Sequence, residues 1–303
     1  MDTLSNVFFA VANKNLHTRK DIALHLGVSV VTVGKAVEVL TKSGLLCMIG
    51  KGSGDIGRKS DFIDVSQSKK ALLVNLCGKN LSYSFSPMSD DFIDIHTIPY
   101  SHSLDFADNV SLLISAIKRR LDIAPCKILI AVPGDPDNGK ISNSYLKDYS
   151  GINIKELFEN QGLDPDVMIS GAVAVESCDD FGENDVFVSV SDNIWGTFGR
   201  GRTEKWSNVP VDNRLNLTYA DSLQCSLEEE RIAMYSLRFL SALENILTPD
   251  RILFSCDRLT DDTINDIKSK ISKLECVSGG TLIFNGLMKL ASMEILKEIS
   301  NKR

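Results

Sequence analysis

The side chains that could bind DNA gather in two short segments near the start of the chain. Cations neutralise phosphates, hydroxyls hydrogen-bond phosphates or base edges, and aliphatic groups touch thymine methyl groups. Residues of these types lie around positions 18–35 and again around positions 51–59. The predicted DNA-binding residues are Thr18, Arg19, Ser29, Val30, Val31, Thr32, Lys35, Lys51, Arg58 and Lys59.

Three helices must position the first segment. Apolar residues at positions 4, 7, 8 and 11 predict an amphipathic first helix. Thr18 and Asp21 have capping-box spacing, which predicts a second helix over residues 19–26 that ends at Gly27. Ser29 caps a third helix that runs to about Ser43. The short gap between the last two helices predicts a helix-turn-helix, whose recognition helix reads base edges with its N-terminal residues.

A hairpin must position the second segment. The apolar run 45–49, the glycine-rich loop 50–60 and the alternating run 61–65 predict strand, loop and strand. A basic hairpin after a recognition helix is typical of a wing that approaches a phosphate or a minor groove. One alternative is a flexible basic loop without DNA contact. A nucleotide cradle is disfavoured, because residues 50–54 lack the order of a phosphate-binding loop.

Charge and composition limit the remaining classes. The chain has 303 residues and a formal net charge of −7, but residues 1–65 carry eight Lys or Arg and six Asp or Glu. DNA binding is therefore expected at this end only. No apolar run reaches the ~18 residues of a membrane span, and no signal peptide is expected. The seven scattered cysteines predict reduced thiols in the cytoplasm.

The pattern changes to strands from residue 71 onward. Strands are predicted over residues 71–76, 81–85 and 92–99, a helix over 104–121, and a buried strand over 127–132 that ends at Pro133-Gly134. Three antiparallel strands, a helix and a strand form the core of the ribonuclease-H-like fold. The fold class we predict is α/β, with an N-terminal winged helix-turn-helix and a two-lobed actin-like ATPase fold.

Four segments resemble the ROK family of repressors, open reading frames and sugar kinases. They are Gly57-Arg58-Lys59, where Gly-Gly-Arg is usual in the wing, the strand 130–134, and the segments 149–154 and 242–253. The resemblance implies a DNA-binding domain over residues 1–66 and a ROK-like body over residues 67–303. The first lobe of this body would span about 67–165 plus the C-terminal helix, and the second about 166–285.

The kinase motifs of the family are altered in this chain. Its Asp-x-Gly-Gly-Thr phosphate loop matches residues 75–79, where Asn75 replaces the acid and Cys77 the first glycine. The catalytic aspartate matches Gly171, and a second phosphate loop matches residues 191–195, which end at Trp195. Phosphoryl transfer needs a group that orients and deprotonates the acceptor hydroxyl, so the resemblance implies no catalytic residue.

Cofactors and metals are not expected. All four histidines precede residue 103, and Cys225 stands alone where the family's zinc-binding cysteines would fall. A structural zinc normally takes four nitrogen or sulfur ligands at close spacing. We predict no metal and no cofactor.

A ligand cleft in the body is the second candidate site. Its residues would be Asn75, Lys79, Asp135, Asp137, Asp192 and Asn193. Asp135, Asp137 and Asn138 could bind a sugar hydroxyl, but a plain turn after Pro133-Gly134 is favoured.

Taken together, these patterns predict a transcription regulator. Its partners would be a double-stranded DNA operator, a second copy of itself in a dimer or tetramer, and a sugar or sugar-phosphate effector, with repression as the expected mode. Two alternatives are a sugar kinase with an appended DNA-binding head, and a body that binds proteins but no small molecule.

Overall fold

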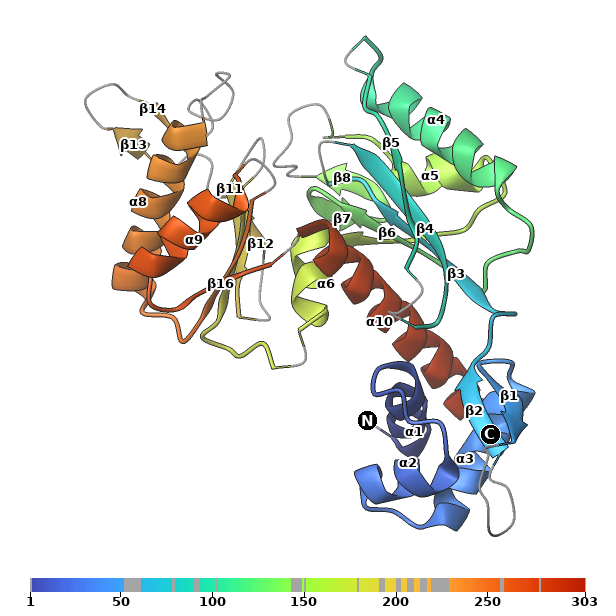
Figure 1. The fold of residues 1–303 in the computed structure, drawn as a ribbon. Coiled ribbons are helices and arrows are strands. Elements are labelled where there is room, and N and C mark those ends of the chain that lie inside the picture. Colours follow the sequence, from blue (N-terminus) through green and yellow to red (C-terminus); the bar gives the residue numbers. More distant parts are fainter. Residues whose placement is uncertain are drawn as a thin grey trace.

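The computed structural model places three groups of elements along the chain (Figure 1). The described residues are 2–51, 61–77, 80–89, 93–101, 103–142, 149, 151–178, 180–190, 194–199, 203–205, 210–212, 217–218, 229–256, 259–277 and 279–302. A small N-terminal head precedes two sheets, each of which carries its own helices.

The head contains three helices and a two-stranded antiparallel sheet. Its elements are α1 (Thr3–Ala12), α2 (Arg19–Leu26), α3 (Val30–Lys42), β1 (Leu46–Lys51) and β2 (Asp61–Val65). The predicted apolar stripe of α1 is buried, as are Val33, Val37 and Leu40 on α3. Burial of these two stripes against each other forms the core of the head.

The helix ends of the head confirm the capping predictions. Thr18 and Ser29 accept hydrogen bonds from the backbone N–H groups of Asp21 and Thr32. Gly27 ends α2 in the left-handed region with φ of 65°, which a residue with a Cβ adopts only at a cost. The helix boundaries therefore follow from local backbone chemistry.

The first sheet of the body has the strand order β5-β4-β3-β6-β9. The first three strands in this order are antiparallel, as predicted for the strands between residues 71 and 99, and the last three are parallel. Strand β9 belongs to this sheet, although it starts beyond the predicted lobe boundary near residue 165. Its four residues are too few to show a strand pattern in the sequence. The strands are β3 (Lys70–Asn75), β4 (Leu81–Pro87), β5 (Ile95–Ile98), β6 (Lys127–Val132) and β9 (Asp166–Ile169).

Two layers of helices cover this sheet. Leu72 and Val74 of β3 pack with α4 (Phe106–Arg119) and α5 (Ile154–Glu159). Ala71 and Leu73 point to the opposite face, toward α6 (Ser170–Glu176) and α10 (Gly279–Asn301). A strand that is buried on both faces explains the continuous apolar runs in the sequence.

The second sheet repeats the plan of the first. Its order is β12-β11-β10-β15-β16, with β12, β11 and β10 antiparallel and β10, β15 and β16 parallel. Its elements are β10 (Val186–Val190), β11 (Ile194–Phe198), β12 (Thr203–Lys205), α8 (Glu229–Leu247), β15 (Ile252–Cys256), α9 (Asp261–Lys270) and β16 (Leu274–Cys276). The small hairpins are β7 (Asp135–Asp137) with β8 (Lys140–Ser142), and β13 (Pro210–Asp212) with β14 (Leu217–Thr218).

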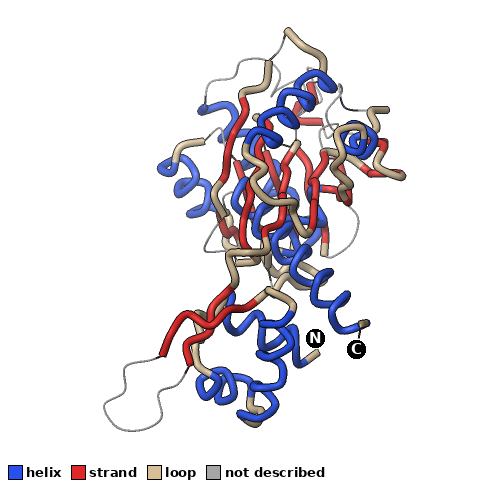
Figure 2. Tube along the Cα trace, turned by 90° about the vertical axis from the view of Figure 1, so that its right-hand side faces the viewer, coloured by secondary structure: helices blue, strands red, loops and turns tan. Residues whose placement is uncertain are grey.

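The long helix α10 joins the head to the body. It packs on α6 and on β3 and β6, and its far end reaches α1 (Figure 1). Lys127 of β6 forms ion pairs with Glu294 of α10 and with Asp166 of β9. Figure 2 shows the two chain termini side by side at the head, where Ser300 donates a hydrogen bond to Asp2.

Among the described residues, no single helix is both long and apolar enough to cross a bilayer. Only α2 and α3 taken together, as a bent pair, are long and apolar enough.

Gly286 should be essential for the packing of α10 on α6. An ideal Cβ at this position would lie 1.9 Å from the carbonyl oxygen of Val173. We expect Gly286→Ala to lower the free energy of unfolding by about 1–3 kcal/mol, because the helices must move apart. The measurement is chemical denaturation of the full chain. The control is Gly182→Ala, whose Cβ would make ordinary contacts, and equal stability of the two variants would contradict the close crossing.

Candidate nucleic-acid interface

The turn between α2 and α3 sets the geometry of the candidate interface. The two helices bend by 116° at Gly27–Ser29. Ile22 and Ala23 of α2 are buried in the core to which Val33 of α3 contributes. The packing of the two helices leaves the N-terminal end of α3 at the surface.

This end of α3 carries five of the predicted residues on an exposed surface. Val30 is 49% exposed and Val31 is 70% exposed, and Ser29, Thr32 and Lys35 are exposed as well. The structure therefore brings these five side chains together. Their arrangement offers two hydroxyls, two aliphatic groups and one cation to a partner.

The hydroxyls of this surface also hold the helix end. The Ser29 hydroxyl oxygen accepts from the Thr32 N–H at 3.0 Å and lies 2.8 Å from the Thr32 hydroxyl. At the start of α2, the Thr18 hydroxyl donates to the Asp21 carboxylate at 2.6 Å. These groups are fixed in place before any partner arrives, and Arg19 next to Thr18 is exposed.

The β1–β2 hairpin is anchored to the loop between α1 and α2. The Ile63 N–H donates to the His17 carbonyl at 2.8 Å, and His17 Nδ1 donates to the Ile63 carbonyl at 2.9 Å. The His17 ring also stacks on Phe62 at a centroid distance of 5.5 Å. No local sequence pattern reveals this role of His17, because Ile63 is 46 residues away. Arg58, Lys59 and the Lys51 side chain, the predicted tip of the wing, lie outside the described residues.

A groove of about 540 Å³ runs along one flank of α3. Its walls come from the start of α1, from α3 and from the end of α10. The lining residues are Asp2, Thr3, Leu4, Val31, Thr32, Lys35, Ala36 and Ser300. Hydrogen bonds from the Ser5 backbone and from Ser300 lower the pKa of the Asp2 carboxyl, so this carboxylate stays charged and bound to the two helices. The last helix of the body thus borders the surface that the sequence predicts for DNA.

The second candidate site lies at the carboxyl ends of the neighbouring parallel strands β3 and β6. Asn75 is buried at the end of β3, and its Oδ1 accepts from the Cys77 N–H at 2.9 Å. Asp135 and Asp137 lie on β7, shortly after β6 ends. Asn138 and Gly139 have φ values of 48° and 82°, which confirms the turn favoured by the sequence. Lys79, Asp192 and Asn193 lie outside the described residues.

Two positions matched to kinase motifs can be placed. Gly171 is buried in the first turn of α6, directly after β9. Trp195 lies on β11 opposite Ser189, but its side chain is outside the described part of the chain. In that part no group of three or more His, Cys, Asp or Glu side chains is arranged to hold a metal ion.

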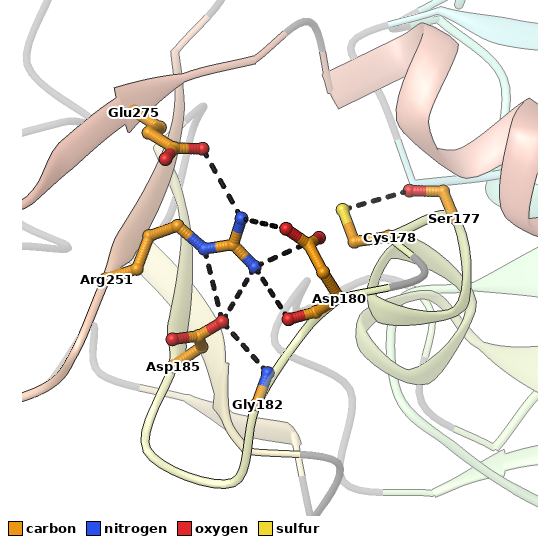
Figure 3. Close-up of polar contacts among 7 residues, drawn as sticks. All are labelled: Ser177, Cys178, Asp180, Gly182, Asp185, Arg251 and Glu275. Carbon is orange, nitrogen blue, oxygen red and sulfur yellow. Dashed lines mark hydrogen bonds and ion pairs between the residues drawn. The ribbon is translucent and has the colours of Figure 1, made fainter.

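Arg251 is the centre of a charged cluster that no sequence pattern indicates. Its guanidinium contacts Asp180 at 3.0 Å, Asp185 at 2.7 Å and Glu275 at 3.6 Å (Figure 3). Burial alone would lower the pKa of Arg251, but hydrogen bonds to Asp180 and Asp185 raise it above its usual range. The partners lie up to 71 residues away, so no local spacing could reveal the cluster. It fixes the segment that links α6 of the first lobe to β10 of the second.

Comparisons with known proteins identify the fold. No protein-family model and no curated protein sequence matches the chain. A solved ROK-family transcriptional regulator, a homologue of the E. coli MLC protein, matches with a TM-score of 0.62 and 13% identity over 97% of this chain and 98% of its own.

Two further ROK structures match the body. A ROK protein from Streptococcus pneumoniae, solved with sucrose, gives a TM-score of 0.54 and 12% identity over 75% of this chain and 99% of its own. A ROK glucokinase from Streptomyces griseus, solved with glucose and AMPPNP, gives a TM-score of 0.54 and 11% identity over 74% of this chain and 98% of its own. The structural neighbours are thus ROK proteins, as the sequence resemblance led us to expect. The chain has a mixed α/β structure with the actin-like kinase fold.

Loss of the Arg251 side chain should destabilise the link between the lobes. Asp185 is almost fully buried and would keep only the Gly182 N–H as a described donor. We expect Arg251→Ala to cost about 2–3 kcal/mol of unfolding free energy, somewhat less than for a fully buried pair. Thermal unfolding measures this loss. Lys155→Ala removes a cation from exposed ion pairs and should barely change the Tm. If both variants melted alike, the Arg251 cluster would not be a stabilising element.

Proposed function

We propose that this chain is a sequence-specific DNA-binding transcription regulator of the ROK type, most consistent with a repressor. The supporting observation is the extent of the structural matches. The glucokinase aligns over nearly its full length with only 74% of this chain, whereas the regulator aligns with 97%. The extra share corresponds in size to the head, which we propose to be a winged helix-turn-helix domain over residues 1–66.

The exposed chemistry of the head supports this proposal. In a helix-turn-helix, the N-terminal end of the second helix enters the major groove while the first helix crosses the backbone. Val31 and Lys35 would then face bases and phosphates, and Arg19 at the start of α2 would face the backbone. The β1–β2 hairpin is held beside the helices by His17, and Arg58 and Lys59 would extend from it as the wing.

The body serves, in this proposal, to pair the heads and to sense a ligand. A two-fold dimer or a tetramer would present recognition helices ~34–36 Å apart, one DNA turn, or a multiple of it. The effector would be a sugar or a sugar phosphate, as the sucrose and glucose held by two neighbours suggest. Its cleft would use Asn75, Lys79, Asp135, Asp137, Asp192 and Asn193. We place the protein in the cytoplasm, where it can reach DNA.

We propose further that the body is not a kinase. The position matched to the family's catalytic base is Gly171, which has no proton-accepting side chain. The position matched to the acid of the phosphate loop is Asn75, whose Oδ1 is engaged with the Cys77 N–H. Neither residue can fill the role of the side chain it replaces.

Neutralising one phosphate-binding cation should change the salt dependence of DNA binding. We expect Lys35→Gln and Arg58→Ala each to weaken binding and to reduce the slope of log K against log salt by about one unit. Fluorescence anisotropy on DNA selected with the full chain measures both quantities. Lys268→Gln, at an exposed position on α9 far from the head, is the matched control. An unchanged slope in the first two variants would remove these residues from the interface.

The proposed loss of kinase activity can be measured directly. The full chain with ATP, Mg²⁺ and a panel of sugars should consume no more ATP than buffer, because Gly171 offers no base. A coupled assay for ADP measures turnover, with a ROK glucokinase as the positive control. Robust sugar-dependent turnover would show that another residue acts as the base and would favour the kinase alternative.

A further inference from the structure

Helix α3 has an unusual composition for a helix that reads DNA. Its whole sequence is Val-Val-Thr-Val-Gly-Lys-Ala-Val-Glu-Val-Leu-Thr-Lys, which contains no Arg, Asn or Gln. Arg reads guanine and Asn or Gln reads adenine through paired hydrogen bonds to base edges. The N-terminal end instead exposes the aliphatic side chains of Val31 and Val30.

The hydroxyl groups at this end are already engaged. The Thr32 hydroxyl lies 2.8 Å from the Ser29 hydroxyl, which also accepts from the Thr32 N–H. These contacts hold the N-cap and reduce the capacity of both side chains for hydrogen bonds to bases. Apolar contact is therefore the chief interaction that this end of the helix offers to a base edge.

Gly34 provides an independent observation. It lies inside α3 with a helical backbone, and beyond its own helical turn a Cβ built on it would meet no atom of the described residues within 4 Å. Glycine is the least favourable residue inside a helix apart from proline, so its presence calls for a reason. Packing against the described residues does not supply one. Because Gly34 is three residues after Val31 and four after Val30, the three lie on the same side of the helix.

We propose that Val30, Val31 and Gly34 form an apolar strip that reads the 5-methyl groups of thymines in the major groove. The two valines contact the methyl groups, and the bare backbone at Gly34 lets the helix approach the base edges closely. The inference rests on the proposed DNA binding and specifies its chemistry: the operator half-site carries thymines opposite the first turns of α3.

The charge around the strip favours DNA over a protein partner. Lys35 is exposed on the next turn of α3, and Arg19 and Lys20 are exposed at the start of α2. Cations that border an apolar strip on a protruding helix end match a methyl group flanked by phosphates. If the strip instead contacts a protein partner, the selection described below should enrich no duplex.

Thymine-to-deoxyuridine replacement tests the strip directly. Duplexes are first selected from a random-sequence pool with the full chain, and each thymine of the selected site is then replaced by deoxyuridine, which lacks only the methyl group. At one or more positions we expect affinity to fall roughly three- to fivefold per methyl group. Val31→Ala should bind the thymine and deoxyuridine forms at those positions nearly equally.

A control variant and two contrary results distinguish the apolar strip from DNA binding itself. Leu112→Ala removes a half-exposed aliphatic side chain from α4 of the body, and it should keep the full preference for thymine. Enriched sites that bind equally well with deoxyuridine at every position would overturn the strip but leave DNA binding intact. If no duplex is enriched at all, the proposed function fails, and the strip fails with it.

Gly34→Ala should move stability and binding in opposite directions. The added methyl group favours the helix and meets no atom of the described residues beyond its own helical turn, so the Tm should rise or stay unchanged. DNA affinity should fall by roughly tenfold or more, because the methyl group holds the helix away from the bases.

A matched variant exists at the far end of the same helix. Thr41 carries a buried hydroxyl with no hydrogen-bond partner among the described residues, so Thr41→Ala also favours the helix but adds nothing to the strip. It should raise the Tm and leave DNA affinity unchanged. Full affinity in Gly34→Ala would show that close approach at this position is not used.

Discussion

The rest of the structure depends on the packing of one helix, α10. It crosses α6 so closely at Gly286 that no side chain fits between the two backbones, and it covers one face of the first sheet. Its apolar residues continue the same core into the head, where they meet α1. A single connected core therefore includes side chains of the head, of α10 and of the first sheet. This packing fixes the position of the head relative to the first sheet.

This arrangement places a structural element of the body beside the proposed DNA surface. The end of α10 is bound to the start of α1 through Ser300 and Asp2, and both residues line the groove that Lys35 also lines. At its other end, α10 touches α6, the first element after the last strand of the first sheet. Because packed helices move as units rather than deform, the orientation of the head is tied to the position of α6.

The body itself shows how one fold serves two kinds of protein. Its two sheets share a plan of antiparallel strands followed by parallel ones, and its structural neighbours include both a regulator and a sugar kinase. Under the proposed function, this chain would differ from the sugar kinases in single side chains at strand and helix ends, such as Asn75 and Gly171, and in its head. The Arg251 cluster, by contrast, keeps the link between the lobes in place and takes no part in the proposed binding.

The sequence by itself determined the features that depend on neighbouring residues. The caps at Thr18 and Ser29, the turn at Gly27 and the buried stripes of the head are as predicted, since each is settled within one or two helical turns. The buried strand over residues 127–132 followed in the same way from its apolar run. Only the tertiary structure decided which distant groups meet: β9 with β6, Arg251 with Asp180 and Asp185, His17 with Ile63, and Asp2 with Ser300. These pairs are separated by tens to hundreds of residues. No periodicity connects such positions, because they come together only when whole elements pack.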